Sequence, residues 1–306
     1  MTLGRRGLAA ILGLALVGGL WSAPVPAGTR PPWVIATYNV GNYTLADRRV
    51  EGTFRRSYPK PELEKSALRA VIARLDADVL ILQEIGGEDF LAELRRDLRS
   101  DGVRYAHGGV VAAADPDRRL AWLSRRAPRE VRAHTDLRSL HAGRSEPVRR
   151  GLLELRWVDG AGELIVFGLH LKSRVAREDD DPGSAGLRLR EAEAIRRRVL
   201  ERVPDLETGC VVVAGDFNDA RSSPVLARFR EQGPRRLFQI VDAADSRGER
   251  WTHRFARDDV YSRVDYILVS EALLRIPGTM QATVLDGPDV AQASDHRPVR
   301  WEWVRE

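Results

Sequence analysis

The sequence predicts a mixed α/β domain in which two β-sheets pack face to face and helices flank them. Amphipathic helical segments interleave with β-forming runs of two kinds, continuously apolar runs typical of buried strands and runs that pair as hairpins. This mixture fits a sheet-on-sheet core better than a single doubly wound sheet. No repeat, low-complexity tract or linker divides the chain after its N-terminal segment, so we expect one folded domain over residues 28–306.

Residues 1–27 have the pattern of a secretory signal peptide. Arg5 and Arg6 precede an uncharged apolar stretch, and small residues and prolines follow up to Ala27. The stretch, about 14 residues long, is short for a bilayer span of about 20. We therefore predict cleavage near Ala27, export to the periplasm or the extracellular space, and no stable membrane insertion afterwards. An uncleaved anchor is the alternative.

The composition indicates a folded protein and only a mildly basic one. The chain has 306 residues, 43% of them hydrophobic, with 49 basic and 44 acidic residues. Cys210 is the only cysteine, so no intramolecular disulfide can form. Charge alone does not identify a nucleic-acid binder, because clustered arginines are more often solvated than bound to phosphates. This interpretation covers Arg118-Arg119, Arg125-Arg126, Arg149-Arg150 and the triplet 196–198.

The first half of the chain gives these elements in order. Residues 33–40 alternate like a strand, and Pro61 opens a helix that runs through residue 75. Residues 78–84 form a continuously apolar strand, and 88–98 form a second helix. Strands follow at 103–111, 119–124, 129–134, 149–157 and 163–171, the last two joined by a turn at 159–162.

The second half begins with a polar loop at 174–186, followed by a surface helix at 187–203. Residues 210–214 form another buried strand. The last strands are expected at 264–269, 280–285 and 299–304.

Polar residues stand at or just beyond the ends of several of these strands, and Asp265 opens one. They offer hard-cation ligands, a general base and phosphate donors, so the sequence predicts a metal-dependent phosphoesterase. The residues are Asn39, Glu84, His170, Lys172, Asp216, Asn218, Asp265, Asp295 and His296.

Asn39, Glu84 and Asp295 are the predicted metal ligands. Mg²⁺ prefers carboxylate and amide oxygens together with waters, and Mn²⁺ or Ca²⁺ can use the same donors. The structural alternatives are that Glu84 caps the helix starting near Glu88 and that Asn39 makes a turn.

Asp216 and Asn218 follow a glycine that can turn the chain off its strand. If the chain stays extended, both side chains point the same way, and the carboxylate can orient or deprotonate a water while the amide donates to a phosphoryl oxygen. An ordinary turn is the alternative.

Asp295 and His296 are neighbours on an extended segment and therefore face opposite ways, Asp295 toward the metal and His296 toward the phosphate. His296 needs an orienting carboxylate, for which Asp265 is the candidate. Asp265 can instead be a surface acid paired with Arg263.

His170 and Lys172 can lean over one face, where an imidazole and an ammonium would suit an anion that gains charge in the transition state. Taken alone, a strand histidine is more often packed than catalytic.

Together these segments resemble the endonuclease/exonuclease/phosphatase superfamily, which includes pancreatic deoxyribonuclease, abasic-site endonucleases, inositol polyphosphate 5-phosphatases and bacterial sphingomyelinases. The resemblance runs from about Trp33 to Trp303, and the strand containing Leu123-Ser124-Arg125 also matches. It implies a four-layered α/β sandwich with the site at one end of the two sheets, and residues 28–306 as the catalytic domain.

The resemblance also implies roles. Asn39 and Glu84 would bind the metal with help from Asp295. Asp216 and Asn218 would handle the water and the phosphate, Asp265 would support His296, and His170 would lie near the scissile phosphate. Asp216 and His296 both stay open as the general base. One departure is Gly41-Asn42, where many members carry an acid, which weakens the case for a second metal.

The expected activity is hydrolysis of phosphodiester bonds, as in a nuclease acting on DNA or RNA, by in-line attack of water. A phosphomonoesterase, a lipid-headgroup phosphatase or phospholipase, and a noncatalytic binding descendant are the alternatives. We expect a monomer. Substrate choice is expected to reside in the 174–186 loop and in 251–255, and no long apolar hairpin suited to membrane insertion is seen.

Overall fold

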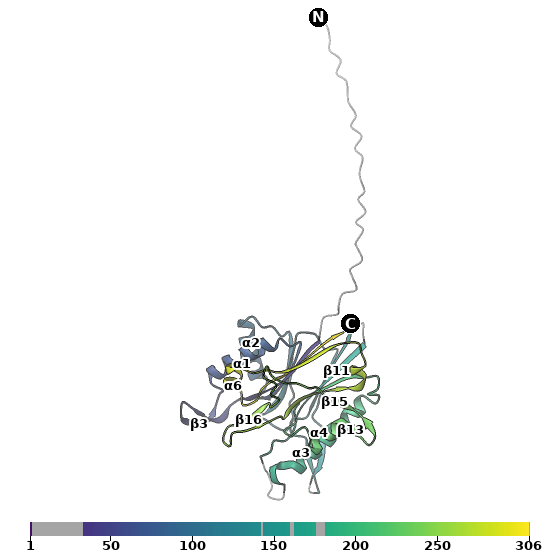
Figure 1. The fold of residues 1–306 in the computed structure, drawn as a ribbon. Coiled ribbons are helices and arrows are strands. Elements are labelled where there is room, and N and C mark those ends of the chain that lie inside the picture. Colours follow the sequence, from purple (N-terminus) through teal and green to yellow (C-terminus); the bar gives the residue numbers. More distant parts are fainter. Residues whose placement is uncertain (2–32, 142, 160–161, 176–180, 306) are drawn as a thin grey trace.

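The computed structural model describes Met1 and residues 33–141, 143–159, 162–175 and 181–305. Two six-stranded mixed sheets make up the centre of the molecule (Figure 1). The first has the order β19 (Gly278–Val284), β20 (Val299–Arg305), β1 (Trp33–Tyr43), β4 (Val79–Ile85), β6 (Arg119–Ser124) and β5 (His107–Val110). The second has the order β15 (Phe238–Ile240), β18 (Asp265–Ser270), β12 (Cys210–Asp216), β11 (Gly162–His170), β10 (Leu152–Asp159) and β7 (Glu130–His134).

Helices cover the outer face of each sheet (Figure 1). The first sheet packs against α1 (Glu62–Leu75), α2 (Glu88–Ser100) and α6 (Pro288–Ala293), and the second packs against α3 (Ala185–Arg202) and α4 (Pro224–Arg230). The predicted sandwich of two sheets flanked by helices is confirmed.

The alternation of side chains along each central strand builds this layered core. In β1, Ile35 faces the second sheet whereas Ala36 packs with the helices outside the first. In β12, Val212 lies between the sheets whereas Val213 packs near Ile195 of α3. Because both faces of these strands are covered, their sequences are apolar at nearly every position.

Short polar elements were not predicted, because they lack a long apolar period. They comprise the hairpins β2 (Ala46–Val50) with β3 (Thr53–Tyr58), β8 (Arg138–His141) with β9 (Arg144–Pro147), β13 (Glu231–Gln232) with β14 (Arg235–Arg236), and β16 (His253–Phe255) with β17 (Val260–Ser262). Strand β15, helices α4, α5 (Glu271–Leu274) and α6, and a 3₁₀-helix at Pro182–Ser184 were also missed.

Two predicted strands begin later than expected. The strand at 103–111 is limited to β5, because the carbonyls of Tyr105 and Ala106 accept hydrogen bonds from Arg95 instead of from a neighbouring strand. The strand at 149–157 begins only at Leu152, because Gly151 has a φ of 66° and ends a turn.

Several other predictions concern segments that lie wholly or partly outside the described residues. The signal peptide and the turn residues Gly160 and Ala161 lie outside them, although β10 and β11 pair as an antiparallel hairpin up to Asp159 and Gly162. Residues 176–180 of the 174–186 loop also lie outside, and α3 begins within that loop at Ala185.

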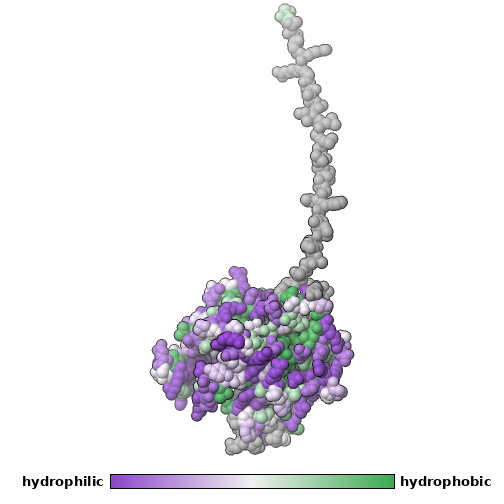
Figure 2. Space-filling model, viewed as in Figure 1, coloured by the Kyte–Doolittle hydropathy of each residue, from purple (hydrophilic) through white to green (hydrophobic). Residues whose placement is uncertain are grey.

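In the part of the chain that the structure describes, no helix is both long and apolar enough to cross a bilayer. Figure 2 shows a face on which hydrophilic residues predominate, with smaller hydrophobic areas between them.

Candidate active site

Three of the predicted residues stand in one row across adjacent strands of the second sheet. His170 ends β11 and is in register with Asp216 at the end of β12, and Asp216 is in register with Asp265 at the start of β18. All three are buried, each with an exposed fraction of 1%. Strand pairing therefore gathers one imidazole and two carboxylates at a single edge of the sheet.

Gly215 makes this row possible, but not by turning the chain as the sequence suggested. It stays within β12, where an added Cβ would lie 2.0 Å from the Leu169 carbonyl oxygen. The left-handed residue is Asn218, with a φ of 52°. Its backbone N–H donates to Asp216 Oδ1 at 2.8 Å, and its side-chain amide donates to the Leu171 carbonyl at 3.0 Å. The chain therefore does not stay extended through Asn218, which was the condition for Asp216 and Asn218 to point the same way.

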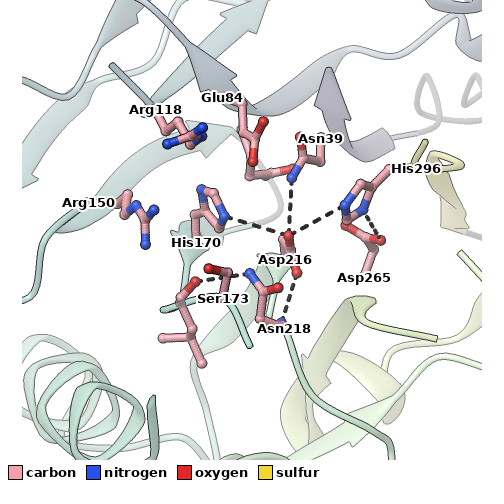
Figure 3. A network of polar contacts seen from close by, with 12 residues as sticks. Asn39, Glu84, Arg118, Arg150, His170, Ser173, Asp216, Asn218, Asp265 and His296 are labelled. Atoms are coloured by element: carbon pink, nitrogen blue, oxygen red, sulfur yellow. Dashed lines mark hydrogen bonds and ion pairs between the residues drawn. The ribbon is translucent and has the colours of Figure 1, made fainter. Parts of the chain in front are cut away.

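Asp216 lies at the centre of the cluster (Figure 3). Its Oδ2 accepts a hydrogen bond of 3.1 Å from the side-chain amide of Asn39, which belongs to the first sheet. The same oxygen lies 3.6 Å from His170 Nε2 and 4.0 Å from His296 Nε2. Side chains from both sheets thus converge on one buried carboxylate.

His296 is held by Asp265. Its Nδ1 lies 2.9 Å from Asp265 Oδ2, and the Asp265 backbone N–H donates to Thr252 Oγ1 at 3.0 Å. Asp265 is thus a buried partner of the imidazole, and the alternative that it is a surface acid paired with Arg263 was wrong.

The surroundings shift the pKa values of the two histidines in opposite directions. For His296, burial opposes the positive charge, but Asp265, Asp216 and Asp295 outweigh it and raise the pKa to about 10. For His170, burial together with the charges of Arg150, His296 and Arg118 holds the pKa well below its usual range. Burial and the charge of Asp265 raise the pKa of Asp216 to about 7, against the charge of His296 and hydrogen bonds from Asn218 and Asn39. The two imidazoles that face Asp216 therefore differ in how readily they bind a proton.

Glu84 occupies a bulge between β1 and β4. It has a φ of 67°, a region that non-glycine residues seldom use, and its Oε2 accepts a hydrogen bond of 2.8 Å from the Asn42 N–H. Helix α2 begins after Gly87 without any side-chain cap, so the alternative that Glu84 caps this helix was wrong. Asn39 does make a turn, because its Oδ1 accepts from the Gly41 N–H at 3.1 Å.

Asp295 lies on the outer side of His296, with 59% of its side chain exposed and Oδ2 3.8 Å from His253 Nε2. Among the described residues, two groups of three acidic or histidine side chains are compact enough to hold a metal ion, His253 with Asp295 and His296, and Asp216 with Asp265 and His296. Glu84 belongs to neither group. The oxygen donors of Asn39, Glu84 and Asp295 suit a hard divalent cation.

Lys172 does not join the cluster around Asp216. Its ammonium donates to the carbonyls of Ser173 and Val175 at 2.9 and 2.6 Å, within its own loop. A substrate-binding role for Lys172 stays a prediction.

His253 was expected only as part of the segment 251–255, where substrate choice was placed, and not as a residue of the catalytic site. Its ring centroid lies 4.5 Å from that of His296, and the two residues form an isolated antiparallel bridge. Strand β16 brings it there, and this strand is too short to give a sequence pattern. A cavity of about 620 Å³ opens beside it, lined in part by Trp251, Arg254 and Asp295.

The sequence matches the profile of a known protein family. The profile of the Endonuclease/Exonuclease/phosphatase family matches residues 36–296, which include every site residue described above. The chain belongs to this family. Its members are hydrolases that act on phosphoester bonds, and they are typically dependent on a divalent metal. A search of curated proteins finds no match.

Solved structures of the same fold are distant in sequence. The human Nocturnin catalytic domain with bound sulfate is 17% identical, with a TM-score of 0.64 over 90% of this chain and 96% of that one. An endonuclease/exonuclease/phosphatase from Beutenbergia cavernae is 20% identical, with a TM-score of 0.61 over 90% and 72%. TDP2 of D. rerio, complexed with a single-strand DNA product, is 16% identical, with a TM-score of 0.58 over 89% and 98%.

Proposed function

We propose that this chain is an exported, metal-dependent phosphoesterase that hydrolyses phosphodiester bonds by in-line attack of water, as a nuclease does. The convergence of Asn39, His170 and His296 on Asp216 carries this proposal. Family membership supports the phosphoester chemistry. The single-strand DNA product bound to the related TDP2 fold supports a diester substrate such as DNA or RNA.

In the proposed mechanism Asp216 is the general base. Its carboxylate is fixed by the Asn218 backbone N–H at 2.8 Å and by the Asn39 amide at 3.1 Å, so the carboxylate keeps one orientation toward the space where a water would bind. Water bound there would transfer a proton to Asp216 as it attacks phosphorus. The alternative base, His296, has its pKa raised to about 10 by Asp265, Asp216 and Asp295 despite its burial, which favours it as a proton donor over a proton acceptor.

The two histidines would stabilise the added charge on the phosphoryl oxygens. His296 is backed by a buried carboxylate and presents Nε2 toward Asp216, and His170 approaches the same oxygen from the neighbouring strand. Donors fixed before the reaction are effective because they need no reorganisation. We propose that the Asn218 backbone N–H positions the base. The Asn218 side-chain amide would give up its hydrogen bond to the Leu171 carbonyl and donate to the phosphate instead.

Asn39, Glu84 and Asp295 are the residues we propose to hold the cation, with Mg²⁺ as the expected ion and Mn²⁺ or Ca²⁺ as alternatives. When bound, such a cation would supply neutralisation of the negative charge on the phosphate. The signal-peptide pattern of residues 1–27 supports export, and we propose a monomer that does not insert into the membrane after cleavage.

Incubation of the purified mature chain with plasmid DNA, RNA, bis-p-nitrophenyl phosphate and p-nitrophenyl phosphate tests the proposal. Each substrate is tried with Mg²⁺, Mn²⁺, Ca²⁺ and a chelator. We expect metal-dependent hydrolysis of the diesters. Hydrolysis of the monoester alone would indicate a phosphomonoesterase, and hydrolysis of no substrate would indicate a binding descendant.

A further inference from the structure

Arg150 is a buried arginine with unsatisfied donors. Only 6% of the residue is exposed, whereas the sequence interpretation expected the pair Arg149-Arg150 on a solvated face. Its Nε lies 3.1 Å from Asp115 Oδ2, an ion pair whose alignment is too poor for a hydrogen bond. Neither Nε nor Nη1 finds a hydrogen-bond acceptor among the residues that the structure describes. A buried guanidinium in this condition costs free energy, which suggests a role other than stability.

The local backbone fixes Arg150 in place. It lies in the turn before β10, where the next residue, Gly151, has a φ of 66° and an added Cβ would lie 2.8 Å from the His134 carbonyl oxygen. Asp115 is itself anchored, because its Oδ1 accepts from the backbone N–H groups of Asp117 and Arg118 at 3.1 Å each. The guanidinium is therefore presented by a defined turn and one buried carboxylate.

Arg150 extends toward the space beside His170, next to the cluster around Asp216 (Figure 3). His170 Nδ1 is also buried and without a hydrogen-bond partner among the described residues. Arg118 lies on the same side, where its Nε donates to Asn42 Oδ1 at 2.8 Å, but Arg118 is exposed whereas Arg150 is buried. Two sets of unsatisfied polar groups thus adjoin the proposed site.

We propose that Arg150 and His170 form a subsite for a tetrahedral oxyanion, in which Arg150 Nη1 donates to a nonbridging oxygen of the substrate phosphate. An arginine suits this task because its planar donors match phosphate oxygens. The oxygens of the oxyanion would accept hydrogen bonds from the Arg150 donors that have no acceptor within the protein. This inference rests on the proposed function, for which it names a phosphate-binding residue.

Calorimetric titration of the mature chain with inorganic phosphate, in Mg²⁺ buffer and without an ester substrate, tests the subsite. The variants are Arg150→Met and Arg150→Lys, and Arg149→Met is the matched control. Arg149 is the neighbouring arginine, 3.9 Å from the same Asp115 oxygen, but a third of its side chain is exposed. The lysine variant keeps the charge beside Asp115, so phosphate affinity can still be measured with it if the methionine variant fails to fold.

We expect Arg150→Met to weaken phosphate binding by about ten- to a hundredfold, the range for loss of one charge-assisted hydrogen bond. Arg150→Lys should recover part of this loss, and Arg149→Met should bind as the wild type does. The kcat/KM for bis-p-nitrophenyl phosphate should follow the same order.

Unchanged phosphate affinity in both Arg150 variants, or no phosphate binding by the wild type, would overturn the subsite. Arg150-dependent phosphate binding in a chain that hydrolyses none of the esters would instead overturn the proposed function and leave the subsite standing.

Discussion

The side-chain amide of Asn39 donates a hydrogen bond to the carboxylate of Asp216 at 3.1 Å, across a separation of 177 residues. Asn39 belongs to β1 of the first sheet and Asp216 ends β12 of the second, so this bond joins the ends of the two sheets. Both residues are about 1% exposed. The packing of one sheet on the other therefore fixes the orientation of the central carboxylate.

Replacing Asn39 by alanine should impair both stability and activity. Loss of the buried amide leaves Asp216 Oδ2 without this donor, which we expect to lower the free energy of unfolding by about 1–3 kcal/mol. Urea denaturation and diester hydrolysis measure the two effects. Gln281→Ala removes an exposed amide from β19 and serves as the control. Unchanged hydrolysis by a folded Asn39→Ala protein would contradict the role given to this bond.

Asp216→Asn and His296→Ala should each abolish metal-dependent hydrolysis while the fold is retained. The first removes the proposed base, and the second removes the imidazole that Asp265 orients at 2.9 Å. We expect losses of at least about a hundredfold in kcat, the lower end for a group in acid–base catalysis. Circular dichroism checks the fold. Near-normal turnover by both variants would remove this assignment.

Gly215→Ala should destabilise the protein severely. The new Cβ would lie 2.0 Å from the Leu169 carbonyl oxygen, so β11 and β12 would have to separate where they align His170 with Asp216. The thermal midpoint is the measurement. Gly102→Ala is the control, because that glycine has a positive φ but no atom within 4 Å of its added Cβ, and it should cost only about 1 kcal/mol. Equal midpoints for the two variants would refute the close-approach explanation.

Glu154 should make stability depend on pH in the acid range. This carboxylate is fully buried, and although burial opposes its charge, hydrogen bonds from His134, Arg202 and Arg156 lower its pKa to about 2. Because this value lies below the ordinary 4.5, the stabilisation is present above about pH 5 and is lost as the pH falls toward 2. The shift corresponds to a free energy on the order of 3 kcal/mol.

Urea denaturation of the wild type and of Glu154→Gln between pH 7 and 3 checks this prediction. The wild type should lose more stability on acidification than the variant does. Glu207→Gln changes an exposed carboxylate and should follow the wild type. Parallel curves for all three proteins would show that Glu154 is not the responsible group.

Glu84→Gln should weaken binding of the cation. The loss of one carboxylate ligand lowers affinity for a hard divalent ion, and calorimetric titration with Mn²⁺ measures it without turnover. Chelation of the wild type should remove activity but leave the circular dichroism spectrum unchanged. A Glu84→Gln protein with wild-type Mn²⁺ affinity would exclude Glu84 from the metal site.

Local patterns in the sequence were enough to predict the sandwich and the family. Apolar runs such as that ending at Ala214 reveal strands covered on both faces, and the polar residues that follow, including Asp216, mark the ends of those strands. Elements without such a pattern, such as β16, which carries His253, could not be predicted.

Which side chains meet was decided only by the tertiary structure. The sequence left Asp265 either buried or on the surface, and strand register put it beside Asp216 and in contact with His296. It gave Arg150 no sign of burial, because one turn and the distant Asp115 enclose it. Periodicity and propensity are local properties, whereas the contacts of a side chain depend on how strands far apart in the sequence pair and how the two sheets pack.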